Sequence, residues 1–160
     1  MNTPDLAARL RALEDLEAIR RLKARYFLAC DRKDPAAMRD CFCSGEVLID
    51  YGPVGTFSRR EQLVEVFERL ACHAHIVEMH HGANPCIEIV DAQRARGTWA
   101  LHYQQIDTQA QRLTQLGGVY DDAYRKDDDG AWRIERTRFV VGSTLVLDLP
   151  LPPATPKDDR

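Results

Sequence analysis

Long apolar runs and an excess of basic residues are both absent from this sequence. No run approaches the roughly 20 apolar residues that a membrane-spanning helix requires. Lysine and arginine number 22 against 25 acidic residues, which gives a formal net charge of −3. Nucleic acids and anionic membranes bind basic surfaces, so we expect neither as a partner. The first residues also lack the basic and then apolar layout of a signal peptide, and we expect a cytoplasmic protein.

The cysteines do not form the patterns of a disulfide framework or a zinc site. The chain has five of them, and Cys41 and Cys43 form C-x-C, where redox and zinc sites have C-x-x-C. A small secreted domain that is stabilised by disulfides favours an even number. We therefore predict free, buried thiols.

Motifs for several common chemistries are also missing. The sequence contains no GxSxG, Walker loop, GxGxxG or HExxH, so nucleophile-elbow hydrolysis and nucleotide binding have no support. Four histidines lie close together, but no carboxylate stands at a standard ligand spacing from His73, His75, His80 or His81. We predict neither a metal site nor a cofactor.

The N-terminal half has the periodicity of helices. Apolar residues recur at threes and fours over residues 3–30, after a start at Thr3 that is typical of an N-cap. A capping acid and a first-turn proline begin a second, short helix over residues 34–42. A capping box at residues 58–61 opens a third helix.

Alternation with period two predicts the strands. One strand precedes the third helix, at residues 47–51, and Gly117-Gly118 indicates a bend or bulge within a later strand. We expect the strands after the third helix to span residues 75–81, 86–90, 94–107, 112–126 and 132–147. Residues 1–149 would form one domain, followed by a flexible, proline-rich tail over residues 150–160.

This order of elements predicts an α+β fold, because helices come first and long strands joined by hairpin turns follow. Antiparallel strands of this length tend to curl around a helix and to enclose a cavity, which is a natural site for a small molecule. The cavity would be apolar, so we expect a small hydrophobic substrate.

Two residues stand out as an acid–base pair. Asp31 lies where the apolar stripe of the first helix ends, and His80 lies in a predicted strand. A carboxylate can hold an imidazole in one tautomer and leave its other nitrogen free as a base near neutral pH. Taken singly, however, each residue also fits a structural role, as a solvated helix-end acid or as a core histidine.

Four aromatic residues are further candidates for the site. Tyr26 and Tyr51 could polarise a carbonyl group or hold a water molecule, or could be core residues with a bonded hydroxyl. Trp99 and Tyr103 share one strand face and could form a pocket wall, or could belong to the core.

The chain resembles the SnoaL-like family of the nuclear-transport-factor-2-like superfamily from about Leu13 to Leu147. The segment from Asp15 to Phe27, followed by Asp31, looks like the opening helix of the bile-acid 7α-dehydratases, and Met79-His80 with Gly82 looks like their histidine strand. Gly97-x-Trp99 and Gly117-Gly118 resemble later strands of those enzymes. Scytalone dehydratase and hexachlorocyclohexane dehydrochlorinase share the helix-end aspartate and the strand histidine.

The resemblance implies a cone-shaped barrel, in which a strongly curved, mixed and mostly antiparallel sheet wraps around the N-terminal helices. It implies that His80 is the base, that Asp31 orients it, and that Tyr26 and Tyr51 match catalytic tyrosines of the bile-acid and scytalone enzymes. The sequence departs from the bile-acid enzymes at Tyr103, which stands in the place of their catalytic aspartate.

The expected function is that of a cofactor-independent lyase. It would eliminate water or another β-leaving group from a hydrophobic cyclic, steroid-like or polyketide-like substrate. One alternative is a double-bond isomerase of the ketosteroid type. Another is a non-catalytic binding or assembly module, such as the small subunit of a ring-hydroxylating oxygenase. Association through the outer face of the curved sheet would give a homodimer or a homotrimer.

Overall fold

The computed structural model describes residues 5–148 and 150, so most of the tail predicted over residues 150–160 lies outside the described part. Helices α1, α2 and α3 span Leu6–Asp31, Pro35–Arg39 and Arg60–Leu70. A short 3-10 helix, η1, spans Gly52–Val54. The strands are β1 (Glu46–Asp50), β2 (Thr56–Arg59), β3 (Ile76–Ile89), β4 (Arg94–Asp107), β5 (Arg112–Lys126) and β6 (Trp132–Asp148).

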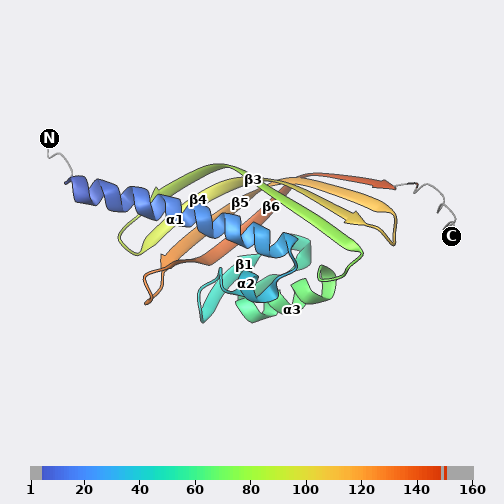
Figure 1. The fold of residues 1–160 in the computed structure, drawn as a ribbon, viewed down its shortest axis with the longest axis horizontal. Helices are drawn as coiled ribbons and strands as arrows, with labels where there is room; N and C mark the ends of the chain where they lie inside the picture. The colour runs from blue at the N-terminus through green and yellow to red at the C-terminus, as the bar shows by residue number, and fades with distance from the viewer. Residues whose placement is uncertain (1–4, 149, 151–160) are drawn as a thin grey trace, which may run out of the picture.

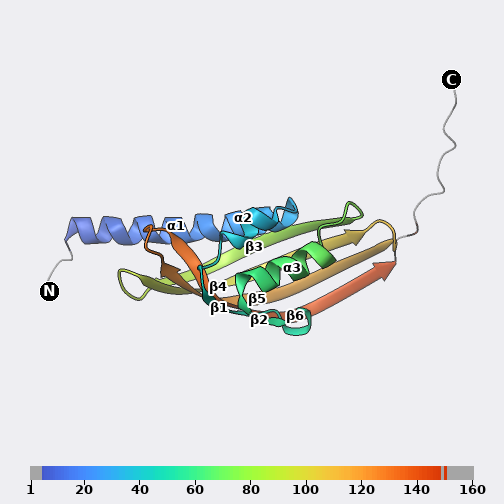
Figure 2. The same ribbon diagram turned by 90° about the horizontal axis from the view of Figure 1, so that it is seen from below.

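All the strands join one curved sheet in the order β2-β1-β6-β5-β4-β3 (Figure 1). Strand β1 pairs parallel with β6, and the other neighbours pair antiparallel, so the sheet is mixed and mostly antiparallel. Helix α1 runs along one face of the sheet, and α3 covers a different part of it (Figure 2). The α+β prediction is confirmed, and β3 lies at one edge of the sheet.

Helix α1 packs on the sheet through its C-terminal half. Its buried apolar residues recur at threes and fours from Ile19 to Cys30, whereas the leucines of its first turns are exposed. Asp5 is the N-cap and its side chain accepts from the Ala7 amide at 3.3 Å, so the helix begins at Leu6. Thr3, the predicted cap, lies outside the described residues.

The two shorter helices differ from their predicted bounds. Asp34 caps α2 as expected, but the helix ends at Arg39 and Phe42 instead forms an isolated β-bridge with Ile134. Helix α3 begins at Arg60, and the side chain that reaches back to the Ser58 amide, at 3.1 Å, is that of Gln62. In the capping box Gln62 therefore has the role that was predicted for its neighbour, Glu61.

The strands after α3 follow the predicted alternation, with one correction. Residues 75–81 and 86–90 were expected to form separate strands, but β3 is continuous and absorbs the intervening residues in a shift of register between Ala83 and Cys86. The bounds of β4 and β5 agree with the prediction. A further shift of register between Gly117 and Gly118 confirms the predicted bulge.

The core lies between α1 and the sheet, and the cysteines contribute to it in part. All five are free; Cys30, Cys41 and Cys43 are buried, but Cys72 is half-buried and Cys86 is exposed. The prediction of buried thiols is therefore wrong for the last two. No helix within the described residues is long and apolar enough to cross a membrane.

Candidate active site

Asp31 and His80 meet, although they are 49 positions apart in the chain. Helix α1 delivers Asp31 from its last turn, and β3 presents His80 on the face that points toward the helix. The Nδ1 atom of His80 lies 2.7 Å from Oδ1 of Asp31. The backbone amide of His80 donates to the same carboxylate oxygen at 3.1 Å, so a single carboxylate holds both the backbone and the ring.

This contact determines which nitrogen of the imidazole can act as a base. An ionised carboxylate can only accept hydrogen bonds, so Nδ1 carries the hydrogen and Nε2 is left free. The ring of Phe27 stacks on the imidazole, with centroids 5.7 Å apart and an angle of 15° between the planes. His80 is therefore fixed in orientation as well as in tautomer.

His80 lines a cavity of about 710 Å³ with mostly apolar walls. This volume lies within the roughly 300–1,000 Å³ that is typical of small-molecule sites. Strands β3 to β6 form one side of it, and α3 closes another through Leu63, Val66 and Phe67. The cavity is thus lined by the sheet and by residues of α1, α2, η1 and α3, with a candidate base in its wall.

Tyr26 and Tyr51 both line this cavity and contact each other, with their hydroxyl oxygens 2.7 Å apart. One hydroxyl donates to the other, so the pair retains one hydroxyl hydrogen for a bound molecule. Burial raises the pKa of both phenols above the ordinary value of 10.0, and neighbouring groups such as Cys30 add to this. The pair therefore stays protonated near neutral pH and can act as a hydrogen-bond donor.

Tyr103 also lines the cavity, beside the base, with its ring centroid 4.7 Å from that of His80. Its hydroxyl donates to Glu78 Oε1 at 2.5 Å and accepts from Gln105 Nε2 at 3.1 Å. The other carboxylate oxygen of Glu78 is paired with the Lys33 ammonium. Glu78 and Lys33 were not among the predicted site residues, although Glu78 stands two positions before His80 and so shares its strand face.

Trp99 does not line the cavity, contrary to the expectation that it forms part of the pocket wall. It is buried in the core, where its indole donates to the hydroxyl of Tyr124 at 2.8 Å. That hydroxyl donates in turn to Asp122, which is paired with the fully buried Lys23 at 2.7 Å. Sequence reasoning missed this ion pair because a lysine in an amphipathic helix is usually solvated.

The buried Lys23 packs against the cavity wall near Tyr26 and Tyr51. Its ammonium lies 3.6 Å from the ring centroid of Tyr120, whose side chain lines the cavity. Burial lowers the pKa of Lys23, and the charge of Asp122 opposes that effect. The hydroxyl of Thr137 donates a further hydrogen bond to Asp122, at 2.6 Å.

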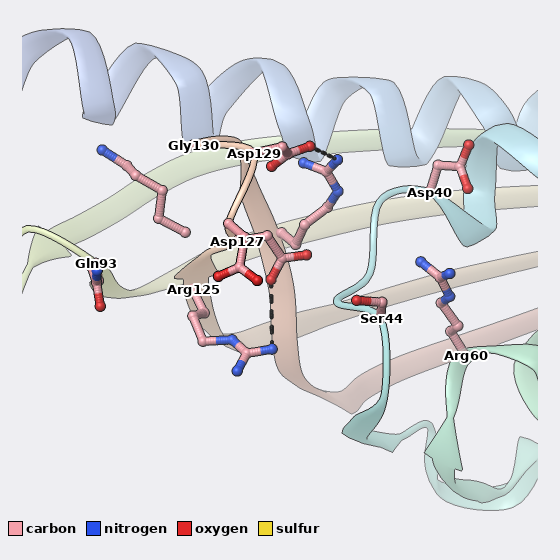
Figure 3. A pocket seen from close by; sticks show the side chains of 11 residues that line it. Asp40, Ser44, Arg60, Gln93, Arg125, Asp127, Asp129 and Gly130 are labelled. Atoms are coloured by element: carbon pink, nitrogen blue, oxygen red, sulfur yellow. Dashed lines mark hydrogen bonds and ion pairs between the residues drawn. The ribbon is translucent and has the colours of Figure 1, made fainter.

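A larger, polar cleft of about 990 Å³ is lined by Gln93 of the β3–β4 turn, by residues where β5 ends and β6 begins, and by the segments around Ser44 and Arg60 (Figure 3). Two of its arginines pair with aspartates of the same cleft: Arg125 lies 3.5 Å from Asp127, and Arg133 lies 2.9 Å from Asp129. Charges that neutralise each other in this way give little driving force for binding a charged ligand. We therefore take the smaller, apolar cavity as the candidate active site.

Metal-ligating side chains do not gather at either place. Within residues 5–148 and 150, no group of three or more histidine, cysteine, aspartate or glutamate side chains could hold a metal ion. The rings of His73 and His75 stack on each other 5.3 Å apart, and neither residue lines the cavity.

Comparisons with known proteins identify the fold. An assigned scytalone dehydratase from Novosphingobium aromaticivorans has 22% identity and a TM-score of 0.77, over 94% of this chain and 97% of that one. A type 3 hexachlorocyclohexane dehydrochlorinase from Novosphingobium barchaimii has 17% identity and a TM-score of 0.78, over 91% and 99%. At these identities the likeness shows the shared fold, which is of the nuclear-transport-factor-2-like type.

The family follows from the sequence itself. The SnoaL-like domain profile matches residues 11–138, which include the Asp31–His80 pair and the cavity wall up to Arg138. This match confirms the resemblance that was based on the opening helix and the histidine strand. The chain belongs to the SnoaL-like family.

Proposed function

We propose that the protein is a cofactor-independent lyase that eliminates water, or another β-leaving group, from a hydrophobic cyclic ketone of steroid-like or polyketide-like type. The observation that carries the proposal is the 2.7 Å contact between His80 Nδ1 and Asp31 Oδ1 in the wall of an apolar cavity. A base that is held in one tautomer beside an apolar cavity suits the removal of a proton from carbon.

In the proposed step, Nε2 of His80 removes a proton from the carbon next to a carbonyl group. The electron pair of that C–H bond becomes a carbon–carbon double bond as the bond to the β-hydroxyl oxygen breaks. The departing oxygen takes the proton back from the imidazolium and leaves as water, which restores the neutral histidine. The Asp31 carboxylate stabilises the imidazolium, and the Tyr26–Tyr51 pair donates to the carbonyl oxygen on which negative charge accumulates.

Two observations speak against a non-catalytic binding or assembly module. Such a module has no need for Asp31 and His80 to lie within hydrogen-bond distance, and side chains could fill its interior. Here the pair is in contact and the cavity is open. Two proteins of similar structure, the assigned scytalone dehydratase and the dehydrochlorinase, are eliminating enzymes by name, which agrees with a lyase.

The test is a panel of cyclic β-hydroxy ketones incubated with the purified protein and followed by mass spectrometry. Elimination removes the mass of one water, whereas the alternative, a ketosteroid-type isomerisation, leaves the mass unchanged. We expect His80→Ala to lower kcat by about 10²–10⁴-fold, because a positioned acid–base group contributes about that much. His81→Ala is the matched control, since that neighbour on β3 is exposed and does not line the cavity.

Asp31→Asn should give a smaller loss than His80→Ala, since the amide still accepts a hydrogen bond but no longer stabilises the imidazolium by charge. Full elimination activity in His80→Ala would overturn the assignment of the base. Conversion of the panel without a change in mass would replace the lyase with the isomerase.

A further inference from the structure

The hydroxyl of Tyr103 has a defined polarity, because its neighbours occupy all but one of its hydrogen-bonding positions. Its single hydrogen is donated to Glu78 Oε1 at 2.5 Å. One of its two lone pairs accepts from Gln105 Nε2 at 3.1 Å. Only a lone pair is left for a bound molecule, so toward the cavity Tyr103 can act as an acceptor.

Glu78 can hold this polarity as a carboxylate that forms an ion pair with Lys33. Its side chain is 8% exposed, and the ammonium of Lys33, which is 20% exposed, is its ion-pair partner. A carboxylate in this state accepts from Tyr103 and has no hydrogen of its own to donate. Burial, followed by the charge of Glu78, raises the pKa of the Tyr103 phenol well above 10.0, so the phenol keeps its hydrogen.

The backbone at Lys33 indicates that a lysine stands at this position because of its positive charge. Lys33 follows the end of α1 with φ of 58°, in the left-handed region that usually holds a glycine at this position. The amide of Asp34 donates to the Ala29 carbonyl at 2.9 Å, as expected where such a residue ends a helix. A lysine costs stability here relative to glycine, and what it supplies in return is the cation beside Glu78.

We propose that Glu78, acting through Tyr103, makes the cavity selective for ligands that present a hydroxyl group beside His80. Glu78 is a positioning residue, and the hydroxyl is the substrate group that it selects. The opposite polarity holds at Tyr26 and Tyr51, which retain a hydrogen to donate. The cavity thus offers a donor to a carbonyl oxygen and an acceptor to a hydroxyl, a pattern that fits a hydroxy ketone better than a halide or an ether.

This inference rests on the proposed function in taking the apolar cavity as the substrate site, but it can be tested by binding alone. The probes are three bicyclic ketones: a β-hydroxy ketone, its methyl ether and the deoxy compound. All three carry two methyl groups on the carbon between the carbonyl and the β-position. That carbon then has no proton to lose, so no probe can undergo the elimination.

Isothermal titration calorimetry gives the dissociation constants. We expect the wild-type protein to bind the hydroxy ketone about tenfold more tightly than the ether or the deoxy compound. A hydrogen bond from a ligand donor to a buried acceptor contributes about that much to affinity. In Glu78→Leu and Tyr103→Phe the three constants should become similar, because leucine cannot accept the Tyr103 hydrogen and phenylalanine has no hydroxyl group. Glu88→Leu, on the exposed side of the same strand, where Glu88 pairs with Arg96, should keep the wild-type preference.

Lys33→Gly separates the effect from a loss of folding. Glycine suits the left-handed backbone and offsets part of the cost of leaving Glu78 unpaired, so this variant should still fold, and yet its preference for the hydroxyl group should weaken. Equal binding of the three probes by the wild type, binding of none of them, or an unchanged preference in Glu78→Leu would overturn the proposal. Failure of the proposed function would appear instead as the absence of turnover with the unblocked panel, whatever the binding preference.

Discussion

Every tyrosine in the described chain is buried enough that the fold suppresses its ionisation. Loss of hydration is the first cause in each case, and nearby groups such as Asp122 and Glu78 add to it. The pKa of all five phenols lies above the ordinary value of 10.0, and these residues are Tyr26, Tyr51, Tyr103, Tyr120 and Tyr124.

These shifts predict a loss of stability in alkaline solution. The unfolded chain releases its phenolic protons near pH 10, whereas the folded chain holds them to higher pH. The stabilisation is therefore complete below pH 10 and is lost as the pH rises above that value. Phenolate absorbance and circular dichroism should change together in one cooperative step. Gradual ionisation around pH 10 with unchanged circular dichroism would contradict this prediction.

At the level of residues, sequence reasoning found the groups with a recognisable pattern and missed those defined by their partners. Asp31 and His80 were found because a helix end and a strand position match a family scheme. Glu78 and Lys33 were missed, because a charged residue next to a turn or in a half-buried strand is ordinarily solvated. Only the three-dimensional pairing across α1 and β3 makes them part of the site.

At the level of elements, the alternation of apolar residues was sufficient to predict the bounds of β4 and β5 but not those of β3. Gly82 to Pro85 has the composition of a turn, but an edge strand can accommodate a proline and an irregular register, so β3 passes through it. Strand β2 was not predicted at all, since four residues are too few to show a period. Its position depends on pairing with β1.

The bulge between β5 and β6 offers a test of local packing. A Cβ atom added at Gly118 would lie 2.5 Å from the carbonyl oxygen of Val140 and 2.6 Å from the ring of Phe139. Gly118→Ala should therefore lower the free energy of unfolding by about 1–3 kcal/mol, the usual cost of overpacking. Urea denaturation measures this value.

Gly142 provides the control for that experiment, because it lies in the same irregular region but has room for a side chain. The nearest atom to an added Cβ there is the Gly117 carbonyl oxygen at 3.5 Å, an ordinary contact. Gly142→Ala should leave the unfolding midpoint nearly unchanged. Equal effects of the two substitutions would show that crowding is not the reason for glycine at position 118.

At the level of the whole molecule, the outer face of the sheet carries apolar side chains that the described chain does not cover. They alternate with the residues that line the cavity and are exposed: Val77, Met79, Val119, Leu145 and Leu147. Patches of this kind often mark contacts between proteins. Association of copies through this face, as a homodimer or a homotrimer, therefore stays a prediction, and the structure now names the residues that would form the contact.

Val119 lies on this face in the middle of β5, where it pairs with Val140 of β6. Val119→Lys would place a charge there, and we expect it to convert an oligomer into a monomer in light scattering coupled to size-exclusion chromatography. Leu28→Lys, at an exposed position of α1 on the other side of the molecule, should leave the mass unchanged. A monomeric wild-type protein, or an oligomer that tolerates Val119→Lys, would contradict self-association through this face.

The hydrogen bond from the His80 amide to Asp31 has a consequence for the sheet as well as for the imidazole. Strand β3 is an edge strand, and this N–H group points away from its only neighbour, β4. An unpaired N–H on such an edge can recruit a strand from another chain and begin aggregation. By accepting a hydrogen bond from this N–H group, Asp31 prevents it from pairing with another strand. A variant that removes the carboxylate altogether would lose solubility along with activity, so Asp31→Asn, which keeps an acceptor, is the variant from which the catalytic role can be judged.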